Sequence, residues 1–124
     1  MDVHNPEDYA EMNLQKLAEM QQELEEVFLP VLERFLVGIR TRPASIAQAI
    51  ADNDPERVAS ESHSLKSVCR QVGFERMGEL AFSLEKLGRS GSLEGGAELA
   101  QLMIQAGQAA HRALSDYIAR LPPA

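Results

Sequence analysis

A histidine and a lysine stand three residues apart in the segment Glu61–Ser67, a spacing that lets them act on one group. On a helix, which turns about 100° per residue, His63 and Lys66 project from the same side. A neutral imidazole keeps a lone pair on one ring nitrogen and can attack an electrophile such as a phosphoryl group. A lysine one turn away can then hydrogen-bond the group that has arrived. The spacing is therefore compatible with nucleophilic group transfer at His63.

Helical periodicity places this histidine on an exposed side. One stripe of the same segment has the 4-3-4-3 spacing of a core face, namely Val58, Ser62, Leu65, Cys69 and Val72. His63 points roughly 140° away from that stripe, together with Ala59, Lys66, Ser67 and Arg70. We therefore expect an accessible imidazole beside two cations.

The neighbours of His63 suit a phosphoryl acceptor. Lys66 and Arg70 disfavour a second positive charge on the ring, and they can offset the charge of a bound phosphoryl group. In-line attack needs open access to the ring. Small residues surround the histidine and leave that access open: Ala59, Ser60, Ser64 and Ser67.

The charge distribution excludes several classes of partner. The 124 residues carry 12 basic and 19 acidic side chains, net −7, which argues against nucleic acid and anionic membranes. The segment His63–Arg89 is the one basic island, with 5 basic and 3 acidic residues.

The single Cys69 lies on the apolar stripe and predicts a buried thiol in a reducing compartment. With neither a membrane-length apolar run nor a signal peptide, we expect a cytoplasmic protein.

Every periodic segment predicts a helix. We expect a first helix at Asp8–Gln22 and a core stripe from Leu24 to Ile39, in which Pro30 starts or kinks a helix. Pro43 is expected in the first turn of a separate segment that ends near Asp52-Asn53.

Three further helices follow. Asp54-Pro55-Glu56 is a start signal for the His63 helix, and Gly73 is placed to end it. The next helices are expected at about Phe74–Gly88 and Leu93–Leu121. Short connections favour an all-α, up-and-down antiparallel four-helix bundle with an additional N-terminal helix. It forms one domain over residues 1–124, with the bundle at about 24–121 and the N-terminal extension at about 7–22.

The helix after the histidine supplies an adjoining surface. With Leu84 set inward, helical geometry turns the opposite side outward, and this side carries Gly78, Phe82, Glu85, Lys86 and Arg89. An exposed aromatic beside a glycine and a basic island favours protein docking. We predict a docking surface made of Ala59, Ser67, Gly78, Phe82, Glu85 and Lys86.

The region resembles the histidine-containing phosphotransfer (HPt) domain of bacterial phosphorelays. Four stretches carry the resemblance: His63-Ser64-Leu65-Lys66-Ser67 with Gly73, Gly78-Glu79-Leu80-Ala81, Leu84-Glu85-Lys86-Leu87, and the upstream Ala49–Asp54 run. It extends over roughly Leu24 to Tyr117. Ser67 stands where the family most often has Gly, and Arg70-Gln71 replaces small or apolar residues.

The resemblance implies that His63 is the phosphoacceptor, Lys66 and Arg89 are phosphate-side or docking residues, and Glu85 presents a polar group towards the histidine. Arg70 adds charge near the ring. The partners implied are receiver domains of a hybrid histidine kinase or a response regulator. We expect no cofactor, the Mg²⁺ belonging to the partner receiver, and we expect a monomer.

Three classes of function remain. The first is a stoichiometric phosphoryl carrier without an ATP site, since no phosphate-binding Gly-rich motif is present. The second, a phosphatase or another all-α enzyme, lacks paired inward carboxylates or a nucleophile–base pair. The third is a non-phosphorylated module that sequesters a receiver through the same face. A metal site at His63 is disfavoured because Lys66 and Ser67 occupy the ligand spacings. His111 is expected to be structural or on the surface, and His4 to lie in a frayed terminus.

Overall fold

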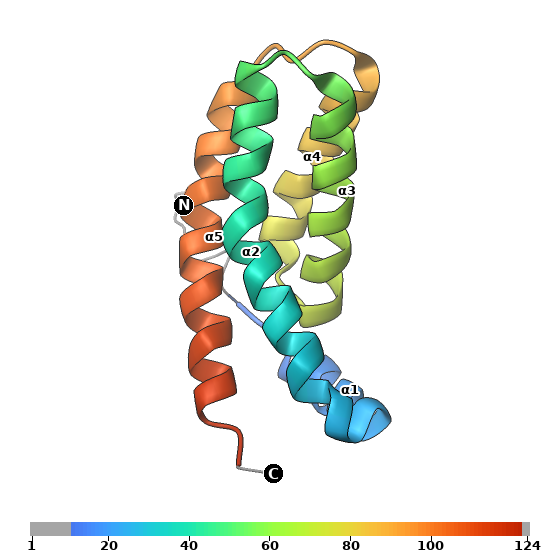
Figure 1. The fold of residues 1–124 in the computed structure, drawn as a ribbon, viewed down its shortest axis with the longest axis vertical. Coiled ribbons are helices and arrows are strands. Elements are labelled where there is room, and N and C mark those ends of the chain that lie inside the picture. The colour runs from blue at the N-terminus through green and yellow to red at the C-terminus, as the bar shows by residue number, and fades with distance from the viewer. Residues whose placement is uncertain (1–10, 123–124) are drawn as a thin grey trace.

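The protein is a bundle of helices (Figure 1). The structure, a computed structural model, describes residues 11–122. Its elements are α1 (Leu14–Leu24), the 3₁₀ turn η2 (Glu25–Val27), α2 (Phe28–Ala51), α3 (Pro55–Val72), α4 (Glu75–Ser90) and α5 (Gly96–Ala119).

Four of the helices form an up-and-down bundle, as the sequence predicted. Each of α2, α3, α4 and α5 packs on two of the others, so that α2 and α4 both lie between α3 and α5. Consecutive bundle helices run in opposite directions, and α1 packs at the end where α2 begins (Figure 1). The apolar stripes meet inside in a core whose largest fully buried side chains include Phe74, Leu32, Leu65, Met77 and Leu114.

The helix that carries the histidine begins and ends where the sequence places it. Asp54 caps α3, its side chain accepting a hydrogen bond from the Arg57 N–H at 3.1 Å, and Pro55 occupies the first turn. Gly73 closes the helix in the left-handed conformation at φ +94°. These local signals fix the frame of α3 and hence the direction of His63.

The N-terminal helix is joined to the end of α3. Asn13 caps α1 through its side chain, and its own N–H donates to the Val72 carbonyl at 3.0 Å. A Cβ on Gly73 would lie 2.3 Å from the Asn13 Cβ, so only glycine allows this approach. Helix α1 ends at Leu24 rather than Gln22, and residues 8–10 of the predicted helix lie outside the described range.

The prediction for Pro43 is wrong. Helix α2 continues from Phe28 to Ala51, with Pro30 in its first turn and Pro43 buried in its interior. A proline there removes one backbone hydrogen bond, but tertiary packing retains the helix. A Cβ on Gly107 of α5 would lie 3.0 Å from the Pro43 ring, so the two helices are in close contact there.

The last two helices differ from expectation only at their ends. Helix α4 covers 75–90 instead of 74–88, because buried Phe74 serves as its N-cap and Gly91 closes it at φ +83°. Helix α5 starts later and stops earlier than the predicted 93–121, since Gly95 at φ +80° precedes its first turn.

Helices α3 and α4 are in close backbone contact at Gly88. A Cβ there would lie 2.6 Å from both the Ala59 nitrogen and the Pro55 carbonyl oxygen. Backbone atoms cannot move aside as a flexible side chain can. Gly88 therefore sets the distance between the two helices that carry His63 and the following surface.

We predict that Gly88→Ala lowers the free energy of unfolding by about 2 kcal/mol or more, because overpacking forces the two backbones apart. Urea unfolding followed by circular dichroism measures the change. The control is Gly38→Ala in α2, where the nearest atom to an added Cβ is 3.7 Å away. That variant should leave stability unchanged or raise it by up to about 1 kcal/mol. Equal stability of the two variants would contradict the close packing.

Candidate functional site

The His63 ring lies at the surface of α3, on the side that faces α4. Its side chain is 56% exposed, as predicted, while the neighbouring stripe from Val58 to Val72 is buried. A partner can therefore reach the ring from solvent. Ala59 and Ser67, on the same side of α3, are half-buried and small.

Glu85 of α4 holds the histidine. Its carboxylate is 3% exposed and lies 2.8 Å from Nδ1 of His63 through Oε2. Lys66 Nζ binds Oε1 at 2.5 Å, and Arg89 Nη2 binds Oε2 at 2.6 Å. One buried carboxylate thus joins the imidazole to two cations, one from each helix.

The prediction that Glu85 is displayed on the outer face is wrong. The α4 helix turns this residue between the helices, where the donors on α3 compensate its burial. The polar contact with the histidine, which the family resemblance implied, is present at 2.8 Å. A helical wheel treats each helix alone and takes no account of a polar network between two helices.

The carboxylate of Glu85 is ionised at neutral pH. Burial by itself would raise its pKa, but hydrogen bonds from Lys66 and His63, together with the charges of Lys66 and Arg89, outweigh that effect. The pKa falls from 4.5 to about 2. An ionised carboxylate only accepts hydrogen bonds, so the bond to His63 assigns a proton to Nδ1. In the neutral ring the lone pair then resides on Nε2.

The predicted cations differ in their surroundings. Lys66 is 12% exposed and Arg89 is 66% exposed, and both bind Glu85. Arg70 is exposed at the end of α3, and no side-chain hydrogen bond of Arg70 is found within residues 11–122. Lys66 and Arg89 are thus gathered at the ring, whereas a charge role of Arg70 stays a prediction.

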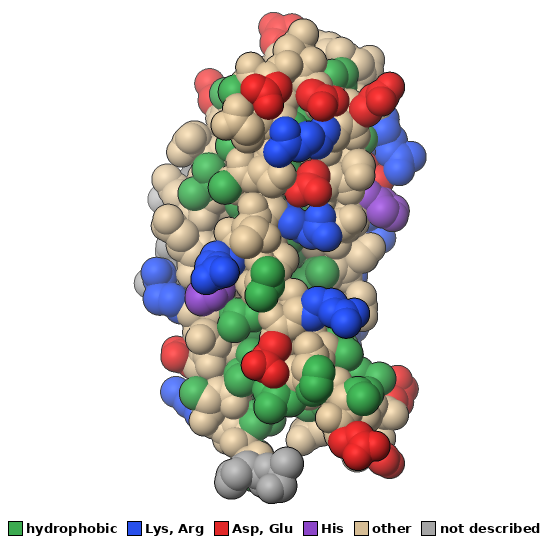
Figure 2. Space-filling view, viewed as in Figure 1, with side chains coloured by type: hydrophobic (Ala, Val, Ile, Leu, Met, Phe, Trp, Pro, Cys, Tyr) green, Lys and Arg blue, Asp and Glu red, His purple; other side chains and the backbone are tan. Residues whose placement is uncertain are grey.

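Phe82 is an exposed apolar side chain beside this site. Its ring is 42% exposed, and the Nζ atoms of Lys66 and Lys86 lie 5.0 and 4.6 Å from its centroid. These distances are within the range of cation–π contacts. Among the described residues, the other large exposed hydrophobic side chains lie on α1, η2 and the first half of α2: Leu14, Val27, Leu29 and Val37. Hydrophobic side chains are also common in the lower half of Figure 2, near that end of the bundle.

Comparisons with known proteins place this geometry in a family. The sequence matches the Hpt domain over residues 30–122. The chain belongs to the Hpt domain family. Among solved structures, it is similar to histidine-containing phosphotransfer protein B (HptB) from Pseudomonas aeruginosa PAO1. The TM-score is 0.81 at 20% identity, over 90% of this chain and 96% of that one. No curated protein sequence matches the chain.

Membership of the family indicates a role in phosphotransfer. Hpt domains are phosphotransfer modules of phosphorelays that interact with receiver domains. The predicted Hpt fold is confirmed by the helical bundle and by the structural match.

Gly78 lies differently from its prediction. It is buried against α3, where an added Cβ would lie 3.5 Å from the Cys69 Cβ, so its predicted display on the outer face is wrong. Its backbone nevertheless lines a hollow of about 410 Å³, together with Arg70, Phe82 and Lys16. A docking role of Gly78 therefore concerns the shape of this hollow.

Lys16 is a residue of this surface that sequence reasoning missed. Its Nζ donates to the Arg70 carbonyl oxygen at 3.2 Å, across 54 positions of the chain. The sequence feature that could have indicated it is Asn13, since asparagine is favoured as a helix N-cap and here precedes the first residue of α1. The sequence alone does not show that α1 lies at the end of α3, because that placement depends on the tertiary contact between Asn13 and Gly73.

The remaining chemistry-bearing residues lie elsewhere. Cys69 is buried, which raises its thiol pKa to about 12 and confirms the prediction of an apolar role. His111 is half-buried on α5, and His4 lies outside the described range. Residues 11–122 contain no group of three His, Cys, Asp or Glu side chains suited to a metal ion. No helix within that range has the length and apolarity to cross a membrane.

We predict that Glu85→Gln lowers the free energy of unfolding at pH 7 by about 2–3 kcal/mol, because three donors lose a buried charged acceptor. The folded pKa of about 2 lies below the ordinary 4.5, so the stabilisation exists above pH 4.5 and disappears as pH falls towards 2. Urea unfolding at several pH values should therefore show the variant converging with the wild type in acid.

Glu79→Gln serves as the matched control, since Glu79 is exposed on the same helix. It should change stability little at any pH. A constant difference between wild type and Glu85→Gln from pH 7 to pH 2 would contradict the role of the ionised carboxylate.

Proposed function

We propose that this protein is a phosphorelay intermediate that carries a phosphoryl group on Nε2 of His63. It takes the group from an aspartate of one receiver domain and passes it to an aspartate of another. The observation that carries the proposal is the 2.8 Å contact between His63 Nδ1 and buried Glu85. That contact holds the ring in the tautomer whose lone pair faces the open side.

The chemistry needs no base. The Nε2 lone pair attacks phosphorus as the bond to the aspartyl oxygen breaks, and the aspartate leaves as a carboxylate. The proton on Nδ1 stays on the ring, and Glu85 stabilises the positive charge that develops there. Attack by the second aspartate on the phosphohistidine reverses these steps and restores the neutral ring.

The cations around Glu85 favour the phosphorylated state. A phosphoryl group adds about two negative charges near neutral pH. Arg89 is exposed enough to turn from Glu85 towards that group, and Lys66 supplies a fixed charge beside the ring. Arg70 adds charge further along α3. Bound to the carboxylate, Lys66 and Arg89 also keep the imidazole correctly placed before the phosphoryl group arrives.

The surface around the His63 ring would bind the partner protein. Phe82 supplies apolar area, Lys86 flanks it, and the small Ala59 and Ser67 leave room for a partner. We propose receiver domains of a hybrid kinase and a response regulator as the partners, with Mg²⁺ held by the receiver. This protein would act as a cytoplasmic monomer that transfers phosphoryl groups stoichiometrically, with no ATP site of its own.

We predict that incubation with a phosphorylated receiver domain and Mg²⁺ transfers acid-labile, base-stable label to the wild type but not to His63→Gln. His111→Gln, which changes a histidine on α5, should label like the wild type. Binding of the receiver without any label on the wild type would overturn the relay and favour sequestration instead. Equal labelling of His63→Gln would exclude His63 as the acceptor. The assay is run with a panel of purified receivers, so that it covers many candidate partners.

We predict that Phe82→Ala weakens receiver binding about tenfold, since a truncated aromatic at an interface costs on the order of 1–2 kcal/mol. Isothermal titration with an unphosphorylated receiver measures the affinity, and circular dichroism checks the fold. Val37→Ala removes a hydrophobic side chain of 53% exposure from α2 and should leave the affinity unchanged. Undiminished affinity of folded Phe82→Ala would remove this residue from the interface.

A further inference from the structure

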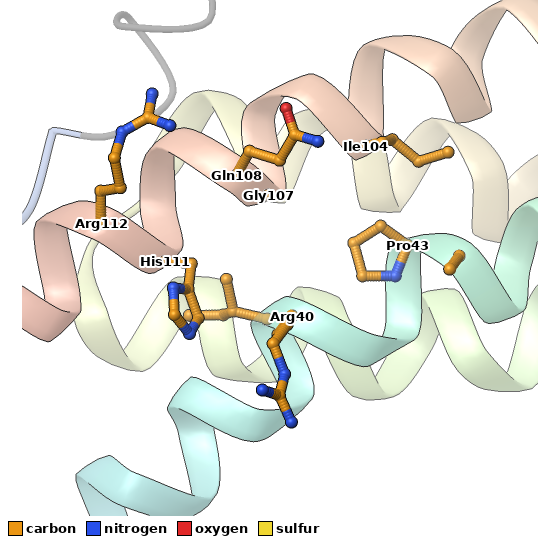
Figure 3. Close-up of a pocket in the computed structure, with 9 residues that line it drawn as sticks. Arg40, Pro43, Ile104, Gly107, Gln108, His111 and Arg112 are labelled. Carbon is orange, nitrogen blue, oxygen red and sulfur yellow. The ribbon is translucent and has the colours of Figure 1, made fainter.

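A second hollow lies in the groove between α2 and α5. Its volume is about 430 Å³, within the range of pockets that hold small ligands. Apolar side chains of Ile39, Pro43 and Ile104 form part of its wall. Figure 3 shows Pro43 and Ile104 on the facing helices. The hollow thus offers an open groove with apolar contact area.

The interior proline removes one backbone hydrogen bond of α2 beside this groove. Pro43 has no N–H, so the Ile39 carbonyl cannot receive the usual helical hydrogen bond from residue 43. That oxygen points towards α5, 3.2 Å from the position of a Cβ on Gly107. Both Ile39 and Gly107 line the hollow.

Cationic and donor groups surround the apolar wall. Arg40 of α2 and His111 of α5 lie at the same end of the groove, and Arg112 lines it from α5 with its side chain directed away from α2 (Figure 3). Among residues 11–122, no acidic side chain lines the hollow. Within residues 11–122, neither arginine forms an ion pair with a carboxylate. In a chain of net charge −7, this local excess of positive charge favours an anion.

The hollow lies away from the phosphotransfer site. His63 faces α4 from α3, whereas this groove separates α2 from α5. Because α2 and α4 each pack between α3 and α5, the two grooves lie on opposite sides of the bundle. A ligand in the second groove would leave the histidine accessible to a receiver.

We propose that the groove between α2 and α5 binds a small organic anion with an apolar body, such as an aryl or branched alkyl carboxylate. The apolar part packs against Ile39, Pro43 and Ile104. The carboxylate lies towards Arg40 and His111, with Arg112 adding charge at the rim. This site needs neither phosphorylation of His63 nor a bound receiver.

The probe is 2-naphthoate, and its neutral counterpart is 2-naphthamide. Titration of the ¹⁵N-labelled protein, followed by ¹H–¹⁵N NMR, should show saturable shifts confined to the parts of α2 and α5 around Arg40 and His111. The amide should bind at least about tenfold more weakly, because it lacks the charge that strengthens hydrogen bonds to arginine. Titrations at two protein concentrations confirm a single site.

Two variants test the wall and the charges separately. Ala44→Phe fills the hollow from an exposed position of α2 and should abolish the shifts. Arg40→Gln/Arg112→Gln should weaken 2-naphthoate binding at least about tenfold. The control Arg34→Gln/Arg120→Gln removes the same amount of charge at two positions outside the hollow. It should bind 2-naphthoate like the wild type.

Absence of saturable binding to the wild type would overturn the proposal. So would equal affinity of the acid and the amide, or wild-type affinity in the Arg40→Gln/Arg112→Gln variant. Transfer of label to His63 is measured in parallel on every variant. Because that readout concerns the opposite groove, failure of the anion site and failure of the relay remain distinguishable.

Discussion

The structure of the site depends on one buried carboxylate between two helices. Glu85 is stable there only because His63, Lys66 and Arg89 supply hydrogen bonds and positive charge. In return it sets the orientation of the imidazole and the location of its proton. A helix pair that carried the same side chains with different spacing would leave either the carboxylate or the histidine without its partner. The chemistry therefore rests on how α3 and α4 are placed.

That placement is maintained at several points along the two helices. Gly88 brings the backbone of α4 against Ala59 at one end of the pair. At the other end, the absence of a side chain at Gly73 leaves room for Asn13, so that α1 packs against the end of α3. Between them lies the ion-pair network around Glu85. The distance from His63 to α4 is defined by two kinds of contact. Small residues lie where the backbones are in contact, and a charged network lies where the side chains are in contact. The surface presented to a receiver follows from that distance.

Much of the site was predictable because local signals control it. Asp54, Pro55 and Gly73 mark the ends of α3, and the apolar stripe fixes which way His63 points. The errors concern features that depend on contact between helices. Pro43 lies within α2 because packing against α5 outweighs a local break in the helix. Glu85 is buried because His63 and Lys66, two of its three partners, are on another helix, and Lys16 contacts Arg70 only in the folded chain. Helical periodicity predicts the faces of single helices, whereas such pairings require the tertiary structure.

We propose that Glu85 directs phosphorylation to one nitrogen of His63. The most direct measurement is NMR of the phosphorylated protein labelled with ¹⁵N in its histidine rings, using the coupling between phosphorus and the imidazole nitrogens. We expect phosphorus to be bonded to Nε2 of His63 and Nδ1 to carry the proton that faces Glu85. A phosphoryl group on Nδ1, or on a residue other than His63, would contradict this proposal.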